Sequence, residues 1–237
     1  MLDPRTKIVI LSGAGLSKAS GVPTFRDADG LWHGHRVEDV ASPRAWFADR
    51  PMVRDFYDGR RISCAAVLPN PGHEALARLQ HAIGPSRCTL ITQNVDGLIQ
   101  KAGAEHVLEM HGSLWRLKCE ADDDHVCVGC FGPQDPERRC GACGSLLRPD
   151  VVWFGEMPYY MEVIQEAVYA CDIFVSVGTS GVVYPAAGLS QIAKAGGART
   201  LEVNPQPSGG AFDEVIEEGS ETALPRMVLD WIDETPA

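Results

Sequence analysis

The sequence of 237 residues lacks any apolar run near the ~18 residues that a membrane-spanning helix needs. It also lacks an N-terminal segment with a basic start and an apolar centre, the pattern of a secretory signal peptide. No internal repeat or low-complexity stretch is present. We therefore expect a cytoplasmic globular protein without a membrane partner. The length fits one sizeable domain, or one domain with a small module.

Positive charge is scarce. Lys and Arg total 21 against 32 Asp and Glu, which gives a net charge of −11. Such a surface repels phosphate backbones, so we expect no nucleic-acid partner. The acidic surface favours basic partners, or does no more than keep the protein in solution. We expect a monomer.

Strand and helix patterns alternate along the chain. The expected strands cover 7–12, 88–92, 107–110, 172–177 and 199–203, and the expected helices cover 73–81, 158–170, 184–195 and 221–232. This alternation predicts an α/β fold with a doubly wound parallel sheet. Residues 24–65 and 119–148 break the alternation and are expected to be insertions. The second is too small to build its own core, so a metal would stabilise it.

Glycines and polar residues follow the expected strands. In open α/β sheets, ligands bind at the carboxyl ends of the strands. Each group alone fits a turn or a helix cap, but five groups are hard to ascribe to capping. We therefore expect them to converge on one ligand. The groups are Gly13, Gly15 and Ser17; Gln93, Asn94 and Asp96; His111 and Gly112; Gly178, Thr179 and Ser180; and Asn204.

The turn Gly13-Ala14-Gly15 follows a strand, as dinucleotide-binding loops do. Gly21 stands too far along for a strict G-x-G-x-x-G, so a hydride-transferring dehydrogenase is poorly supported. Glycine still lets the backbone approach a pyrophosphate, and we expect free N–H groups at the following helix start to bind its charge. A lone histidine such as His111 is more often structural than catalytic. Its imidazole is nevertheless the side chain best suited to move a proton near neutral pH.

Five of the eight cysteines lie between residues 119 and 143, and two pairs have C-x-x-C spacing. In a reducing compartment this clustering favours a metal over disulfides, with unliganded thiols as the alternative. Zinc prefers four tetrahedral ligands, and a closed set of sulfur ligands is structural. We expect one structural Zn²⁺ and leave open which four candidates bind it. The candidates are Cys119, Cys127, Cys130, Cys140 and Cys143, with His125 as a remote sixth; Cys64, Cys88 and Cys171 are expected core residues.

Seven motifs, in order along the chain, resemble those of the sirtuin family, and the resemblance covers nearly the whole sequence. It implies one catalytic domain, 1–237, in which NAD and acyl-lysine meet between two parts. The large, Rossmann-like part comprises 1–24, 66–118 and 149–237; the small part comprises 25–65 and the zinc module 119–148. The motifs are Gly13-Ala-Gly-Leu-Ser17, Ser20-Gly-Val-Pro-Thr-Phe-Arg26, Gln93-Asn-Val-Asp96, His111-Gly112, Val152-Trp-Phe-Gly-Glu156, Gly178-Thr-Ser180 and Asn204.

The resemblance also implies the chemistry, which is NAD-dependent removal of acyl groups from lysines of acylated proteins or peptides. Nicotinamide leaves, the acyl oxygen attacks the anomeric carbon of the ribose, and the products are free lysine, nicotinamide and O-acyl-ADP-ribose. His111 would be the general base on a ribose hydroxyl, and Asn94 and Asp96 would position the nicotinamide ribose and amide. The residues implied to bind NAD are Gly13, Ala14, Gly15, Ser17, Thr24, Phe25, Arg26, Trp32, Gln93, Asn94, Val95, Asp96, Gly178, Thr179, Ser180, Asn204, Pro205, Gln206 and Ser220.

Within the family, the segment from Phe56 to Arg61 resembles the Y-x-x-R signature of class III members. Tyr57 and Arg60 share one face of a helix, and a hydroxyl beside a guanidinium fork suits the carboxylate of a succinyl or malonyl group. The alternative is an ordinary tyrosine and arginine on a helix surface. Ala28 matches the small residue that leaves the acyl channel wide.

Three positions depart from the family pattern. Ile99 stands where most sirtuins have histidine, beside the expected contacts to the nicotinamide ribose. Asp27 replaces the usual Ala or Gly near the acyl channel. Asp122 stands where a partner of Cys119 is usual, so either the Cys127/Cys130 pair replaces Cys119 or Cys119 pairs with one of them.

Two other functions remain open at this point. An NAD-dependent protein ADP-ribosyltransferase would use the same nicotinamide cleavage with another acceptor. A zinc-ribbon module that binds nucleic acid is disfavoured by the net charge of −11.

Overall fold

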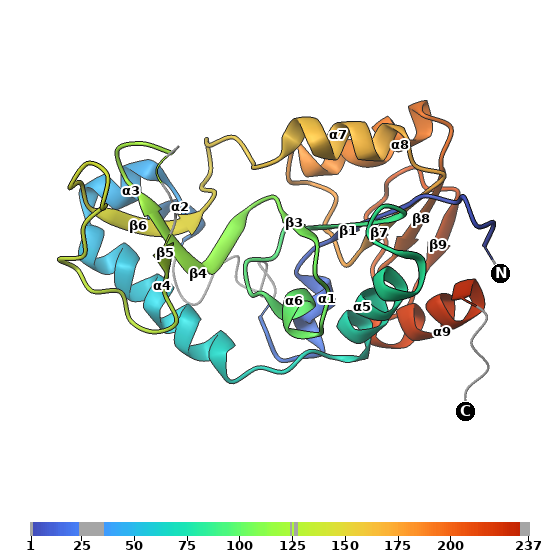
Figure 1. Cartoon of the computed structure of the whole chain (residues 1–237), viewed down its shortest axis with the longest axis horizontal. Helices are drawn as coiled ribbons and strands as arrows, with labels where there is room; N and C mark the ends of the chain where they lie inside the picture. Colours follow the sequence, from blue (N-terminus) through green and yellow to red (C-terminus); the bar gives the residue numbers. More distant parts are fainter. Residues whose placement is uncertain (1, 24–35, 124, 126–127, 233–237) are drawn as a thin grey trace.

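The computed structural model describes residues 2–23, 36–123, 125 and 128–232, and these form two sheets (Figure 1). The larger sheet has six parallel strands in the order β3-β2-β1-β7-β8-β9. The prediction of a doubly wound parallel sheet is confirmed. The short edge strand β9 was not predicted. The strands are β1 Ile8–Ser12, β2 Cys88–Thr92, β3 Val107–Glu109, β7 Ile173–Val177, β8 Arg199–Val203 and β9 Glu214–Ile216.

Helices cover both faces of this sheet because its central strands are apolar on both sides. In β1, Ile8 and Ile10 pack with one group of helices, and Val9 and Leu11 pack with the other. The first group comprises α1 Gly15–Lys18, α5 Pro71–Ile83, α6 Leu98–Lys101 and α9 Ser220–Ile232; the second comprises α7 Met161–Tyr169 and α8 Leu189–Ala195.

Two predicted helices begin later than expected. The helix expected from residue 158 starts at Met161, after Tyr160 adopts a left-handed conformation with φ 61°. The helix expected from residue 184 starts at Leu189, because Ala186–Gly188 form a 3-10 turn first. Among the described helices, none combines the length and apolar character that crossing a bilayer requires.

The second sheet is antiparallel, with the order β5-β4-β6. Its strands are β4 Gly112–Cys119, β5 Val128–Gly129 and β6 Leu147–Val151, and the helices α2 Val37–Val40, α3 Pro43–Ala48 and α4 Arg50–Ala65 lie beside it (Figure 1). Trp46, Phe56 and Tyr57 from these helices share a core with Leu114 and Trp153. The sheet begins at Gly112, ahead of the boundary that the sequence suggested at residue 119.

Candidate active site and metal centre

The glycine loops that follow β1 and β7 lie against each other. The strand order of the large sheet reverses between these two strands. A Cβ on Gly15 would lie 2.6 Å from Gly178 Cα, and a Cβ on Gly13 would lie 2.8 Å from Gly178 O. Glycine is therefore required at both positions, and the backbone at this edge carries no side chain that would keep a ligand away. Ligands of doubly wound sheets bind at this switch point.

The amides of the turn after this loop already have partners. Gly15 N donates to Gly178 O at 2.9 Å, Leu16 N donates to Gly13 O at 3.0 Å, and Ser17 N donates to Ala14 O at 3.1 Å. The expectation of free amide donors at this helix start is therefore wrong for these three groups. The physical reason is that α1 is a single short turn that closes on the loop before it.

Ser17 joins the first glycine loop to the loop after β2. Its Oγ donates to Asp96 Oδ2 at 2.7 Å, and Asn94 Nδ2 lies 3.2 Å from Ser17 Oγ and 3.0 Å from Gly13 O. Ser17 and Asp96 are buried, and the second Asp96 oxygen accepts from Leu98 N at 2.9 Å. Two of the expected strand-end groups therefore form one hydrogen-bonded unit.

His111 stands at the same edge, after β3. Its Nδ1 lies 3.2 Å from Gln93 O. Because a carbonyl oxygen only accepts, Nδ1 carries the hydrogen and Nε2 is left as a free base. Burial lowers the pKa of His111 and the hydrogen bond to Gln93 raises it, with a net pKa below 6.5. The imidazole is therefore neutral at pH 7.

The loops after β7 and β8 complete the edge. Asn204 Nδ2 donates to Thr179 O at 2.8 Å. Ser220 begins α9, and its buried Oγ has no hydrogen-bond partner within the described part of the chain, so a ligand can use it. The other expected NAD residues are Val95, which is buried, and the exposed Ser180, Pro205 and Gln206. Thr24, Phe25, Arg26, Asp27, Ala28 and Trp32 lie outside the described residues.

Tyr57 and Arg60 both lie on the buried side of α4. Tyr57 is fully buried, and its hydroxyl accepts a hydrogen bond from Trp153 Nε1 at 2.8 Å. Arg60 is 7% exposed. Burial lowers the pKa of Arg60, and the neighbouring Cys64, Tyr57 and Asp96 raise it. Asp96, the carboxylate that Ser17 binds, is therefore among the groups that favour the charged form of Arg60.

The next residue, Arg61, has a different set of partners. Its Nε donates to Gly132 O at 3.0 Å, its Nη1 donates to Leu114 O at 3.1 Å, and it forms an ion pair with Asp58. These partners belong to α4 itself, to the second sheet and to the loop after β5. Arg61 thus joins α4 to β4 and to the loop after β5.

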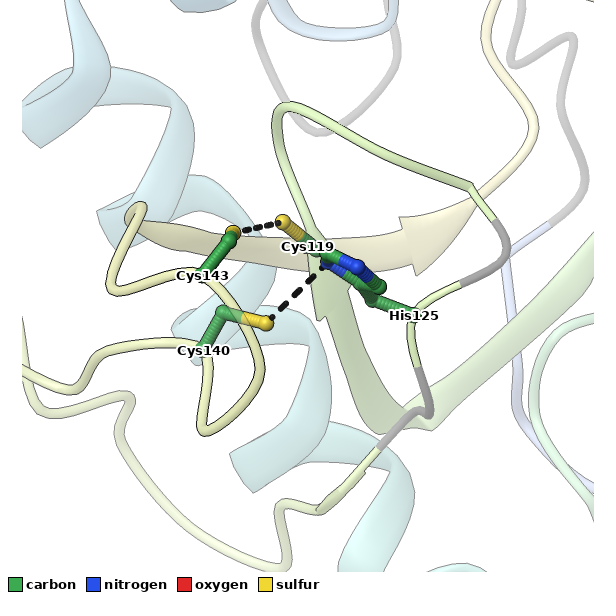
Figure 2. A group of neighbouring side chains, drawn as sticks. All are labelled: Cys119, His125, Cys140 and Cys143. Atoms are coloured by element: carbon green, nitrogen blue, oxygen red, sulfur yellow. Dashed lines mark hydrogen bonds between the residues drawn. The ribbon is translucent and has the colours of Figure 1, made fainter.

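Four side chains cluster at one end of the second sheet. Figure 2 shows Cys119, at the end of β4, together with His125 and with the turn that carries Cys140 and Cys143. Cys119 and Cys143 Sγ are 3.5 Å apart, Cys140 Sγ is 3.5 Å from His125 Nδ1, and all four ligand atoms lie within 4.8 Å of one another. Two sulfurs bound to one tetrahedral zinc at ~2.3 Å are ~3.8 Å apart. The cluster therefore fits one zinc ion.

Among the described candidates, the cluster holds three of the five expected cysteines together with His125, the remote sixth. Cys130 Sγ donates to Gly132 O at 3.3 Å and is not part of the cluster, whereas His125 is. Cys127 lies outside the described residues. The antiparallel pairing of Cys119 with Leu147 places Cys119 beside the turn that precedes β6, and C-x-x-C spacing alone does not reveal this long-range pairing.

Comparison with known protein families matches residues 13–185 to the Sir2 family. The chain belongs to this family. NAD-dependent protein deacylase SIR2rp3 of Trypanosoma brucei brucei is 46% identical over 99% of this chain and 96% of its own length. The NAD-dependent protein deacylase of Escherichia coli strain K12 is 44% identical over 94% of this chain and 81% of its own length.

Two solved structures of Sir2 homologues also resemble the chain. A homologue in complex with NAD has a TM-score of 0.85 and 35% identity, and the match covers 96% of this chain and 90% of that one. A mutant homologue in complex with 2′-O-acetyl-ADP-ribose has the same TM-score and identity, with 96% and 92% covered.

In this Sir2-family site, His73 is a residue that the sequence analysis missed. It is fully buried in α5, its Nδ1 accepts from Asn70 N at 3.1 Å, and its Nε2 lies 3.2 Å from Ser17 Oγ. Because Nδ1 accepts, Nε2 carries the hydrogen and donates to Ser17, which in turn donates to Asp96. Burial lowers the pKa of His73 to about 4. The motif HEALARLQH predicted only a helix, and it gave no sign of this contact.

Ile99 packs in the apolar core between the large sheet and α5, at 3% exposure. In this member of the Sir2 family, the side chain that replaces the usual histidine is therefore a core residue.

Proposed function

We propose that this chain, an NAD-dependent protein deacylase of the Sir2 family, removes succinyl and malonyl groups from protein lysines as well as acetyl groups. The observation that supports this substrate range is the burial of Tyr57 and Arg60 on the same side of α4. A buried guanidinium is stabilised by a negatively charged partner. The carboxylate of an acidic acyl group would be a further negative charge for Arg60 to bind.

We assign the NAD pocket to the strand-end loops. NAD supplies the ADP-ribosyl group. Its bond to nicotinamide breaks, nicotinamide is released, and the acyl group ends on the ribose as O-acyl-ADP-ribose. Gly13, Gly15 and Gly178 let the backbone meet the pyrophosphate, and Ser220 and Asn204 offer polar groups to the adenosine half. Asn94 and Asp96, fixed by Ser17, hold the nicotinamide half.

His111 is assigned the role of general base. Its Nε2 takes the proton of a ribose hydroxyl, since Nδ1 is committed to Gln93 O. The lowered pKa keeps Nε2 unprotonated at pH 7. The NAD and acyl-lysine sites would then meet at the edge where His111 lies.

The first test is a panel of acetyl-, malonyl- and succinyl-lysine peptides with NAD, followed by mass spectrometry. Arg60→Met is expected to lower kcat/KM for the succinyl peptide about 10–100-fold more than for the acetyl peptide, because a hydrogen bond to a charged group is lost. Arg54→Met, on the same helix, is the matched control and should leave the ratio of the two efficiencies unchanged. Equal losses on both peptides in Arg60→Met would remove the acyl assignment.

The same panel separates deacylation from ADP-ribosyl transfer. Nicotinamide release that requires an acylated peptide supports deacylation, whereas label transfer from NAD to protein without one supports the transferase. We further propose that the enzyme is cytosolic and monomeric. The elution volume of the purified protein in gel filtration tests whether it is a monomer.

A further inference from the structure

The hydroxyl of Tyr57 has a fixed hydrogen-bond direction. Trp153 Nε1 lies 2.8 Å from the Tyr57 oxygen, and both side chains are buried. An indole N–H only donates, so the Tyr57 oxygen is the acceptor in this contact. The Tyr57 hydrogen must therefore point away from Trp153.

We infer that Trp153 is a positioning residue that holds Tyr57 as a hydrogen-bond donor toward the carboxylate of an acidic acyl group. The inference rests on the proposed function, since it concerns the same Tyr57 and Arg60 pair. A carboxylate only accepts, so a tyrosine that reads it must present its hydrogen rather than its oxygen. The Trp153 contact leaves Tyr57 in that state before any substrate arrives.

The indole of Trp153 is itself held on several sides. The Arg148 guanidinium lies 4.0 Å from the centre of its ring, and the Trp46 ring lies 5.9 Å away. Glu156 accepts from Trp153 N at 2.8 Å and from Arg148 Nη2 at 2.5 Å. The indole therefore cannot turn away from Tyr57 without breaking this packing.

The Tyr57 hydroxyl keeps its hydrogen. Burial raises the pKa of Tyr57 to about 12, so the hydroxyl stays protonated across the neutral range. In the part of the chain that the structure describes, no oxygen is recorded as an acceptor for it. A buried donor without an acceptor is unfavourable, and a carboxylate bound between Tyr57 and Arg60 would remove that penalty.

Trp153→Phe tests the inference because phenylalanine keeps an aromatic ring and removes the N–H. We expect the ratio of succinyl to acetyl kcat/KM to fall about tenfold, mainly through a higher KM for the succinyl peptide. Tyr57→Phe should lower the same ratio, and the double variant should be no worse than Tyr57→Phe alone, since both changes remove one coupled interaction. Trp46→Phe is the matched control and should leave the ratio unchanged, because phenylalanine keeps an aromatic ring against Trp153 and the lost N–H donates to Glu120 Oε2 at 2.9 Å instead.

Each result separates the inference from the proposed function. If Tyr57→Phe and Arg60→Met do not change the ratio, or the wild-type enzyme does not desuccinylate, the proposed function fails. If those two variants lower the ratio and Trp153→Phe does not, or if the Trp153 and Tyr57 effects multiply in the double variant, only the inference fails.

A second measurement applies if Trp153→Phe does not fold. The indole N–H signals of the full-length wild-type protein and of Tyr57→Phe are compared by ¹⁵N NMR. Loss of the Tyr57 oxygen should move one hydrogen-bonded indole signal upfield. If no indole signal moves in this way, Trp153 does not donate to Tyr57 and the inference is overturned.

Discussion

The two sheets of the molecule are stabilised in different ways. The six-stranded sheet is buried between helices on both faces, and its two apolar clusters contain mainly Leu, Ile, Val and Ala side chains. The cluster at the far end of the second sheet contains Leu117 and Leu147 and otherwise three cysteines. Two of these, Cys119 and Cys140, belong to the Cys/His group that fits zinc.

The two sheets therefore differ in what stabilises them. The large sheet can depend on apolar burial, whereas the end of the small sheet has too few apolar groups to do so and depends on a metal. The proposed active site lies where the two sheets meet. His111 shows this most directly, because its ring bonds to Gln93 in the large part and its carbonyl accepts from Val152 N after β6, at 3.0 Å.

Removal of zinc tests this difference between the two sheets most directly, and it has the largest expected effect. Structural zinc sites contribute on the order of 10 kcal/mol of binding free energy to folding. A strong chelator should therefore unfold the region around residues 119–148 and abolish activity, while the six-stranded sheet persists. Limited proteolysis with mass spectrometry shows which segments become cleavable. Uniform cleavage of both sheets would break the comparison.

The same experiment identifies the ligands through single variants. His125→Ala and Cys143→Ala should bind less than one zinc per chain, whereas Cys130→Ser should keep it, since Cys130 Sγ lies on Gly132 O. Full zinc content in His125→Ala would contradict the ligand set. Cys127→Ser completes the series for a residue outside the described ranges.

Replacement of His111 should affect catalysis and neither sheet. We expect His111→Asn to lower kcat about 10²–10⁴-fold, because a general base contributes that much, with zinc content and unfolding midpoint retained. The neutral form is the active one, and the folded pKa lies below 6.5, so the acid limb of the wild-type kcat/KM profile should fall below pH 6.5. An acid limb centred above pH 6.5 would show that His111 is not the group that titrates. Loss of zinc in His111→Asn would show that the residue has a structural role.

A substitution at Gly15, where the two glycine loops lie against each other, should lower the unfolding free energy of the large part alone. The effect should be smaller than that of zinc removal. Gly15→Ala puts a Cβ 2.6 Å from Gly178 Cα, and such overpacking costs about 1–3 kcal/mol of unfolding free energy. NAD affinity should fall with it. Gly59→Ala in α4 is the control, because the described atoms leave open space there, and it should stabilise by about 0.5–1 kcal/mol. Urea titrations with and without NAD measure both effects.

The sequence predicted the parts of the molecule that local patterns determine. Alternating apolar strands and helices predicted five of the six parallel strands closely, and the polar residues after them do meet at one edge. The strand β9 has only three residues at an edge of the sheet and shows no clear pattern. Two helices begin later than predicted, one after the left-handed residue Tyr160 and one after the 3-10 turn at Ala186–Gly188. These two features depend on packing, so the local pattern does not predict them.

Long-range contacts explain what the sequence could not predict. Cys130 lies outside the metal cluster because the pairing of β5 with β4 places it beside Trp115. His73 reaches Ser17 only because α5 packs under α1. Arg60 and Arg61 are neighbours of the same type, and only the folded chain shows that Arg61 bonds to the backbone carbonyls of Leu114 and Gly132.

The two adjacent arginines connect the proposed acyl site with the segment that carries the metal cluster. Helix α4 carries the side chain that is proposed to choose the acyl group, and it is tied through Arg61 to Gly132, in the segment between Cys119 and Cys140. Loss of the zinc ion should therefore disturb α4 as well as the metal centre itself, because the Arg61 contact to Gly132 transmits the change to the helix.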